Sequence, residues 1–375
     1  MNATPQTPEP PPSAYAEAGV DEEREQVAFA RVMRPWLART KVRSSMVTSI
    51  TGLASGYFAT IMHLPPGPAI ALTTDGVGTK IMLAEEAGRW EPIGLDCVAN
   101  NVNDLICVGA VPLALLDYIA TDRIDEGVLD EVARGLFLGA ELAGIAIPGG
   151  EIAQIGEMLA TSKNGAPTLD LVGTAIGAVP NERTPLDGAN VRPGDAVIGL
   201  PSSGLHSNGY SLARYALFKK GGLGLDDQVP GTGRRLADAL LQPTRVYVNA
   251  AESLWTAGLT PHGMAHISGG GLLNITRLAA NVSYVLDSLP DAPEVFALIA
   301  SAGDVDAATM YATFNMGIGF CIVVAEEDLQ AALDTLKAAG EDATRIGTVT
   351  DEPGRTVTLP APGLKGRGDT FEPVR

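Results

Sequence analysis

The stretch TTDGVGTK, residues 73–80, follows the apolar run AIAL at residues 69–72. The apolar run has the length of a buried strand, and the glycines after it end the strand. These glycines permit positive φ and let backbone N–H groups approach a ligand. Asp75 could hold Mg²⁺, and Lys80 could meet a phosphate as a point charge. The stretch predicts a strand followed by a turn, which is either a bare turn or one wall of a nucleotide site.

The composition of the chain is that of a globular protein. It has 375 residues, of which 46% are hydrophobic and 19% charged, and this length suits two domains with separate cores. The 44 acidic and 26 basic residues give a net charge of −18. Nucleic acid is therefore not an expected partner, because phosphate backbones need a basic face. A small anionic ligand is compatible with this charge, because a site can be locally positive.

Several features predict a cytoplasmic protein without a membrane partner. Cys97, Cys107 and Cys321 lie in apolar stretches without metal-ligand spacing, which is typical of buried free thiols. No apolar run reaches the length of a membrane span. The Pro-rich N-terminus lacks the pattern of a secretory signal, so we expect residues 1–14 to be a disordered arm.

Strand-like and helix-like segments alternate along the chain, which predicts a mixed α/β fold. We expect strands at residues 69–74, 112–120, 145–148, 169–179, 196–201 and 317–325. We expect helices at residues 93–110, 124–144, 210–220, 235–257 and 326–339, and a helix start at residues 269–271. Residues 181–195 are polar and rich in Pro and Gly, which indicates a domain boundary, and the similar composition after residue 360 indicates a peripheral tail.

One predicted helix carries a polar face of unusual composition. Asp96, Asn100, Asn103 and Asp104 share one narrow face, opposite apolar residues. A solvated face usually mixes Lys and Glu, whereas this face has no cation. Short acids and amides suit a metal ion or a ribose. The alternative is an exposed polar stripe.

Three further stretches place polar side chains beside glycines. Glu151 follows two glycines at a predicted strand end, where active-site residues of α/β proteins gather. The loop SSGLHSNGYS, residues 202–211, combines hydroxyls, an amide and His206 ahead of a helix, which is typical of an anion site. The stretch AHISGGG, residues 265–271, offers His266 and either a second phosphate cradle or a capped helix start. A surface turn is the alternative for Glu151.

Together these motifs resemble the phosphoribosylformylglycinamidine cyclo-ligase family. The stretches that carry the resemblance are AGVD (18–21), TTDGVGTK (73–80), GLDCVANNVNDLICVGAVPLALLDYIATDRID (94–125), GGE (149–151), GDAVIGLPSSGLHSNGYSL (194–212), LLQPTRVYV (240–248), AHISGGG (265–271), MYATFNMGIGF (310–320) and GEDATRIGTV (340–349). They occur in the family's order. Selenophosphate synthetase and thiamine-monophosphate kinase share single motifs, whereas the histidine loop together with MYATFNMGIGF favours the cyclo-ligases.

The resemblance implies a two-domain synthetase-like fold. An N-terminal ATP-binding domain, residues 15–185, would contribute strands to a β-barrel at a homodimer interface. A C-terminal α/β domain, residues 186–355, would pack beside it, with residues 356–375 as the peripheral tail. The implied reaction uses ATP and Mg²⁺ to cyclise formylglycinamidine ribonucleotide to 5-aminoimidazole ribonucleotide, ADP and phosphate in purine biosynthesis.

The resemblance also implies roles for individual residues. The catalytic residues would be His206, Asp75 and Glu151, and the metal ligands would be Asp75 and Asp104. The ATP and phosphate site would comprise Gly76, Val77, Gly78, Thr79, Lys80, Asp96 and Asn100. Substrate would meet Ser203, Gly204, Asn208 and His266.

Two departures from the family pattern keep alternatives open. The region TGLASGYFAT, residues 51–60, retains only two glycines of a Gly/Phe-rich loop, and Ile152 and Gln154 replace a usual Thr and Glu. A nucleotide-binding paralogue without cyclo-ligase turnover, or another ATP-dependent phosphoryl-transfer relative, is the alternative function.

Overall fold

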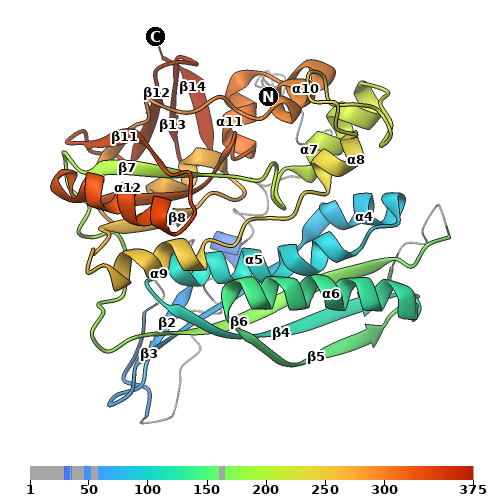
Figure 1. Ribbon diagram of the computed structural model, residues 1–375, viewed down its shortest axis with the longest axis horizontal. Coiled ribbons are helices and arrows are strands. Elements are labelled where there is room, and N and C mark those ends of the chain that lie inside the picture. The colour runs from blue at the N-terminus through green and yellow to red at the C-terminus, as the bar shows by residue number, and fades with distance from the viewer. Residues whose placement is uncertain (1–28, 34, 36–45, 52–57, 160–164, 375) are drawn as a thin grey trace, which may run out of the picture.

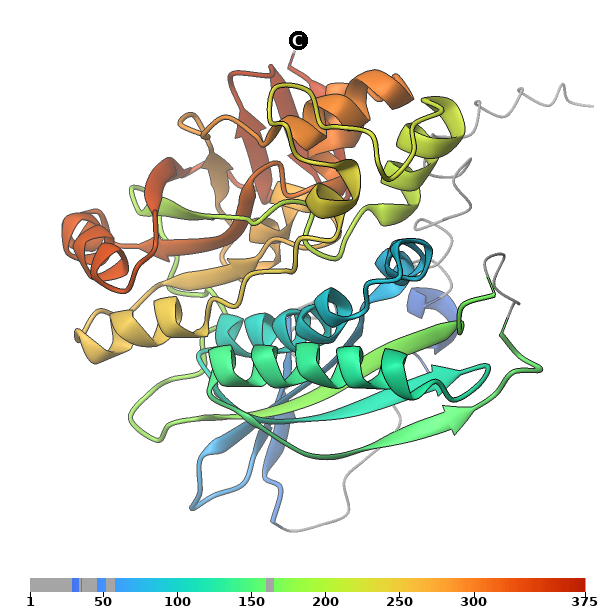
Figure 2. The ribbon, with the colours of Figure 1, turned by 45° about the vertical axis from the view of Figure 1, so that its right-hand side comes forward.

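The protein consists of two α/β domains, each built on one β-sheet (Figure 1). The computed structural model describes residues 29–33, 35, 46–51, 58–159 and 165–374. Helices α5 (Glu91–Cys107) and α6 (Glu126–Ala143) lie between the N-terminal sheet and the C-terminal domain, as both ribbon views show (Figure 2). This arrangement confirms the predicted mixed α/β class. Both the expected arm, residues 1–14, and the glycine-poor loop at residues 52–57 lie outside the described residues.

The N-terminal sheet has six strands. In spatial order they are β1 (Ser49–Thr51), β2 (Thr60–His63), β3 (Ala69–Gly76), β6 (Leu169–Val179), β4 (Val111–Thr121) and β5 (Ala146–Gln154). β4, α6 and β5 form a βαβ unit, because β4 and β5 are parallel. The Asp125 side chain accepts hydrogen bonds from the first turn of α6, and Gly144, with a φ of 66°, ends the helix. β5 is longer than the expected strand at residues 145–148, since it pairs with β4 as far as Gln154.

One face of the N-terminal sheet packs on the helices and the other is open within the described part of the chain. β6 alternates buried and exposed residues along its whole length, as a half-covered strand should. Leu116, Tyr118 and Ile176 of β4 and β6 point away from the helices and are 51%, 42% and 37% exposed. The sheet therefore presents an apolar surface, which we call the open face.

The C-terminal sheet has eight strands. In spatial order they are β14 (Thr370–Pro373), β13 (Leu364–Arg367), β12 (Thr356–Leu359), β9 (Ser283–Val285), β11 (Thr344–Thr350), β7 (Ala196–Pro201), β10 (Ile318–Val324) and β8 (Gly263–His266). The remaining helical segments are η1 (Phe29–Met33), η2 (Gly78–Lys80), α4 (Ile81–Ala87), α7 (Tyr210–Arg214), η3 (Tyr215–Lys220), α8 (Leu236–Leu240), α9 (Val248–Thr256), η4 (Gly271–Arg277), α10 (Glu294–Gly303), α11 (Ala307–Thr313), η5 (Glu326–Asp328) and α12 (Leu329–Ala338).

Two expectations about the C-terminal half are wrong. Residues 235–257 form two helices, α8 and α9, because Pro243 lies in the segment 241–247 that separates them. Residues 356–374 are not a peripheral tail, since β12, β13 and β14 are strands of the sheet and Val357 and Leu359 are fully buried.

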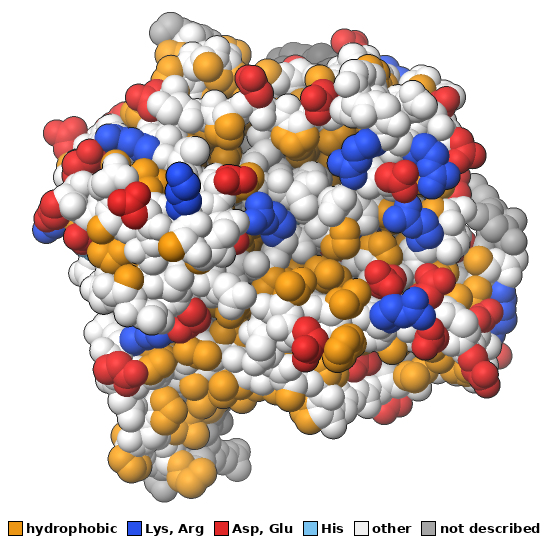
Figure 3. Space-filling model, in the orientation of Figure 1, with side chains coloured by type: hydrophobic (Ala, Val, Ile, Leu, Met, Phe, Trp, Pro, Cys, Tyr) orange, Lys and Arg blue, Asp and Glu red, His pale blue; other side chains and the backbone are white. Residues whose placement is uncertain are grey.

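The surface and the helices carry two further observations. On the face shown in Figure 3, Lys and Arg side chains are interspersed with Asp and Glu rather than gathered in one basic patch. No helix in the described ranges is both long enough and apolar enough to traverse a bilayer.

Candidate functional site

Asp75 lies at the end of β3, where α5 supports the turn that follows. The backbone N–H of Gly76 donates to Asp75 Oδ1 at 2.8 Å. From α5, the side-chain amides of Asn100 and Asn101 donate to the carbonyl oxygens of Gly76 and Asp75, at 3.2 and 3.1 Å. The turn after β3 is therefore held in place by α5, and two buried acceptors, Asn100 Oδ1 and Asn101 Oδ1, have no partner among the described residues.

Asp75 is electrostatically coupled to residues of both domains. Burial among protein atoms, followed by repulsion from Asp104, raises the pKa of the Asp75 carboxyl to about 6, while His266 and Arg277 act in the opposite direction. The side chain nevertheless keeps an exposed surface, so solvent or a ligand can reach it. The sequence did not indicate Arg277, the last residue of η4, because its contacts cross the domain junction and leave no local pattern.

Asp104 joins the N-terminal domain to His266 of β8. Its Oδ1 lies 2.9 Å from His266 Nδ1, and His266 Nε2 is buried without a hydrogen-bond partner among the described residues. Asp104 and His266 therefore meet at the domain junction, and both act electrostatically on the Asp75 carboxyl. No group of three or more His, Cys, Asp or Glu side chains in the described ranges could hold a metal by itself. Two carboxylates nevertheless suit Mg²⁺, which is usually held by one or two carboxylates plus phosphate oxygens.

Lys80 and Asp96 do not face this space, contrary to expectation. Both side chains are fully buried, with Lys80 Nζ 2.7 Å from Asp96 Oδ2. The ammonium also donates to the carbonyl oxygens of His206, at 2.9 Å, and Gln242, at 2.8 Å. Asp96 Oδ1 accepts hydrogen bonds from the backbone and hydroxyl of Thr244, both at 2.7 Å. Because these charges are satisfied within the chain, neither residue is available to phosphate or metal.

Part of the polar face of α5 is neither a metal or ribose site nor an exposed polar stripe, which were the two alternatives from the sequence. It binds another segment of the chain instead. Asn103 donates to the carbonyl of Arg245 at 2.8 Å and accepts from the N–H of Tyr247 at 2.9 Å. Asn103 and Asp96 therefore bind the segment 241–247, which replaces the middle of the expected long helix. Only Asn100 and Asp104 of the predicted face lie toward the candidate site.

His206 lies inside the C-terminal domain rather than on a surface loop. Its backbone is left-handed, with a φ of 62°, and its side chain is buried. Nε2 accepts a hydrogen bond from the Ser203 N–H at 3.2 Å, whereas Nδ1 has no partner among the described residues. Burial, followed by electrostatic effects of His266, Lys80 and Arg245, lowers the pKa of His206 well below its usual range. The imidazole is consequently neutral at physiological pH.

The rest of the histidine loop is partly occupied by internal contacts. Ser203 Oγ donates to the Pro243 carbonyl, and the Gly204 carbonyl accepts from Asn315 at 2.8 Å. Asn208 borders the triglycine turn, since a Cβ at Gly269 would lie 3.3 Å from its Oδ1.

The glycine turn after β3 also meets the histidine loop. Thr79 Oγ1 lies 3.2 Å from Ser211 Oγ, so two loops predicted to bind ligand meet at the domain junction. Val77 is buried at this turn, whereas Gly78 and Thr79 are exposed.

Glu151 does not join this group within one chain. It lies on β5, three strands from β3 in the sheet, which is roughly 14 Å at the usual strand spacing. It pairs with Tyr118 and so points to the open face, whereas Asp75 pairs with Gly173 on the helix-covered face.

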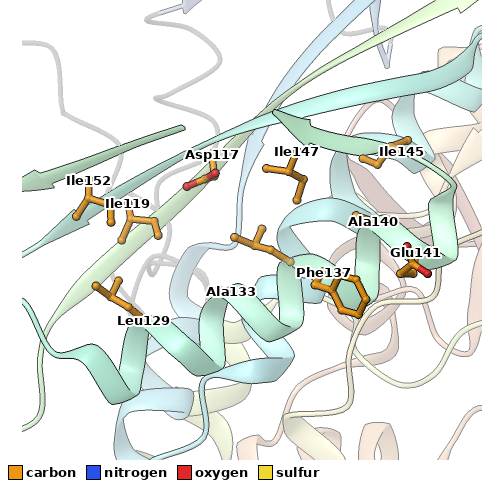
Figure 4. A pocket seen from close by; sticks show the side chains of 11 residues that line it. Asp117, Ile119, Leu129, Ala133, Phe137, Ala140, Glu141, Ile145, Ile147 and Ile152 are labelled. Carbon is orange, nitrogen blue, oxygen red and sulfur yellow. The ribbon is translucent and has the colours of Figure 1, made fainter. Parts of the chain in front are cut away.

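A separate pocket lies between α6 and the edge of the N-terminal sheet (Figure 4). Its volume is about 500 Å³, and its lining is apolar apart from Asp117 and Glu141. Desolvation raises the pKa of Asp117 above its usual value. None of the predicted site residues lines this pocket.

Two family models and several curated relatives match this chain. The model of the family described as "AIR synthase related protein, N-terminal domain" matches residues 56–179, and that of the "C-terminal domain" matches residues 192–360. A phosphoribosylformylglycinamidine cyclo-ligase of Methanothermobacter thermautotrophicus is 44% identical over 347 residues, which cover 92% of this chain and 97% of the relative. The chain belongs to the phosphoribosylformylglycinamidine cyclo-ligase family. Cyclo-ligases of Pyrococcus furiosus (42% identity, covering 91% and 96%) and Myxococcus xanthus (44%, 90% and 96%) agree.

Solved structures extend the cyclo-ligase likeness to the fold. "AaThiL complexed with AMPPCP and TMP" aligns with a TM-score of 0.61 at 16% identity, covering 94% of this chain and 98% of that one. The hydrogenase maturation protein HypE aligns with a TM-score of 0.59 at 21% identity, covering 82% and 89%. At such identities the likeness concerns the fold alone, and it confirms the synthetase-like architecture.

Proposed function

We propose that this cyclo-ligase family member closes the imidazole ring of 5-aminoimidazole ribonucleotide from formylglycinamidine ribonucleotide, at the expense of ATP. Relatives at 39–44% identity over about nine-tenths of the chain bear the cyclo-ligase name. The observation in the structure that carries the proposal is the Asp104–His266 contact across the domain junction, 2.9 Å between Oδ1 and Nδ1, on the helix that supports the glycine turn.

The chemistry requires activation of an amide oxygen. Phosphorylation of the formyl oxygen converts a poor leaving group into a good one, so that an amidine nitrogen can attack the same carbon and phosphate can depart. Such phosphoryl transfer demands positioning and charge neutralisation more than covalent catalysis. A junction between two domains, where one contributes carboxylates and a glycine turn and the other contributes a histidine loop, suits this demand.

Each group in the junction has a proposed task. Mg²⁺, held by Asp75 and Asp104, would neutralise charge on the phosphates of ATP. Backbone N–H groups of the exposed turn at residues 78–79 would face those phosphates. Asn208 would contact the ribonucleotide. His206, being neutral, would act through a hydrogen bond rather than as a charged acid.

We further propose that the protein is a homodimer that assembles through the open face. Exposed apolar patches of this kind mark interaction surfaces in soluble proteins. The known resemblance implies a barrel made from two copies of this sheet, and pairing would remove the exposed side chains of β4 and β6 from water. We also place the protein in the cytoplasm, with which the buried free thiols Cys97, Cys107 and Cys321 agree.

A phosphate-release assay tests the proposed function. Purified protein, ATP and Mg²⁺ should release phosphate only when formylglycinamidine ribonucleotide is added, with one ADP formed per ring closed. Asp104→Asn should abolish this release. The control variant Glu352→Gln, which removes an exposed carboxylate far from the junction, should leave it unchanged. Nucleotide binding without substrate-dependent phosphate release would favour the non-catalytic paralogue. Release with a different phosphoryl acceptor would favour another phosphoryl-transfer activity.

A further inference from the structure

The predicted phosphate cation, Lys80, is not available, and the structure offers a different one. Arg277 is the last residue of η4, which follows the triglycine turn and packs against β8, the strand of His266. Its side chain is exposed. Several other arginines are paired with carboxylates, for example Arg183 with Glu252 and Arg245 with Glu341. Arg277 has no ion pair or hydrogen bond with any described residue.

The guanidinium of Arg277 is nevertheless held in place. Its carbon lies 5.3 Å from the ring centroid of Phe58, which is itself buried in the N-terminal domain. A guanidinium that stacks on an aromatic ring uses its flat face and leaves its N–H groups free for hydrogen bonds in its own plane. The contact crosses the domain junction, so it positions an unsatisfied, five-donor cation beside the candidate site.

The positive charge of Arg277 acts on the Asp75 carboxylate, although the two do not form an ion pair. Arg277 is among the positive charges that oppose the effect of burial and of Asp104 on the Asp75 pKa. An acid that holds Mg²⁺ and a free arginine beside it form the two halves of a phosphate site, because phosphate oxygens can bridge from metal to guanidinium. In a chain with a net charge of −18, such a local cation favours the binding of an anion at this place.

We propose that Arg277, held against Phe58, binds a phosphate group of one of the two phosphorylated reactants at the domain junction. This inference rests on the proposed function for the identity of the reactants. The shared chemistry is a phosphate that receives charge-assisted hydrogen bonds from a planar guanidinium. The phosphate belongs either to ATP or to the ribonucleotide, and the two sources give different kinetic results.

Arg277→Gln tests the proposal, with Arg345→Gln as the matched control. Arg345 is also an exposed arginine of the C-terminal domain, but it pairs with Glu326. Arg277→Gln should raise one KM at least about tenfold, which is the loss of one charge-assisted interaction. A rise in KM for ATP assigns the nucleotide phosphate, and a rise in KM for formylglycinamidine ribonucleotide assigns the ribonucleotide phosphate. Both KM values within twofold of wild type would overturn the proposal.

Two further measurements separate this inference from folding and from the proposed function. Arg277→Lys keeps the charge but loses the planar fork, so its KM should lie between those of wild type and Arg277→Gln; this variant replaces Arg277→Gln if the latter does not fold. Calorimetric titration with adenylyl imidodiphosphate plus Mg²⁺, and separately with ribose 5-phosphate, needs no turnover. If wild type binds either probe through Arg277 but does not cyclise the substrate, the proposed function fails and the inference stands. Equal binding of both probes by wild type and Arg277→Gln would overturn the inference.

Discussion

At the scale of single residues, the protonation of Asp75 links pH to cation binding. Its pKa is raised to about 6 by burial and by Asp104, and a carboxylate must lose its proton to bind Mg²⁺. We expect Mg²⁺-dependent affinity for an ATP analogue to rise between about pH 5 and about pH 7. Asp75→Asn should lose this binding at both pH values. Calorimetric titration with and without Mg²⁺ measures it, and retained Mg²⁺-dependent binding by the variant would exclude Asp75 as a ligand.

The same raised pKa has the opposite effect on stability without ligand. Because the folded-state pKa of Asp75 lies above the model value of 3.8, the folded protein holds this proton more tightly than the unfolded chain. The resulting stabilisation is complete below about pH 3.8 and is lost as pH rises through about 6. Asp75→Asn should therefore melt at a higher temperature than wild type near pH 7, and this difference should shrink as the pH falls toward about 4. Scanning calorimetry of both proteins without ligand measures this difference in melting temperature. If the pKa of Asp75 were not raised, the difference would not change with pH.

His206 can be tested with a residue that tolerates its backbone. Its φ of 62° lies in the left-handed region, where Asn is among the least strained residues. We predict that His206→Asn folds with a Tm near that of wild type but turns over about 10²–10³-fold more slowly, because one positioned hydrogen-bonding imidazole is lost. His206→Ala should lose turnover and also melt earlier. If His206→Asn turns over within a few-fold of wild type, His206 has only a structural role.

At the scale of elements, α5 connects the two domains through buried charge. Asp96→Asn would leave the Lys80 ammonium buried without its counter-charge, which should lower the free energy of unfolding by about 3–5 kcal/mol. Arg89→Gln is the control, because the Arg89–Asp238 pair is partly exposed and its loss should cost less than about 1 kcal/mol. Urea denaturation measures both. Similar losses for the two variants would mean that the buried Lys80–Asp96 pair contributes no more to the free energy of unfolding than the partly exposed Arg89–Asp238 pair.

Local sequence signals predicted the elements well where they were continuous. β6 and β7 have the bounds predicted from their apolar runs, because alternation and terminal Pro or Gly residues mark both ends. The polar face of α5 was also predicted, but its role was not, since its partners lie about 140 residues away in the segment 241–247. Long-range pairing of this kind leaves no local pattern. For the same reason the burial of Lys80 was missed and Arg277 was overlooked.

At the scale of the whole molecule, the open face predicts the assembly. Leu116→Glu should give a monomer, because it places a charge in an interface that would otherwise bury apolar side chains. Leu142→Glu is the matched control, since Leu142 is a similarly exposed leucine on α6, on the other side of the sheet. Light scattering at micromolar concentration should report a dimer for wild type and for the control. A monomeric wild type would contradict the proposed assembly.

The segment 241–247 restricts how the chain can be recombined with its relatives. Asp96 and Asn103 belong to the first half of the chain, whereas the backbone groups that satisfy them belong to the second. A chimera joined in the linker near residue 185 would therefore separate halves of one hydrogen-bonded unit. Such a hybrid should keep a native junction only if α5 and the segment 241–247 come from the same parent, even though they are far apart in the gene.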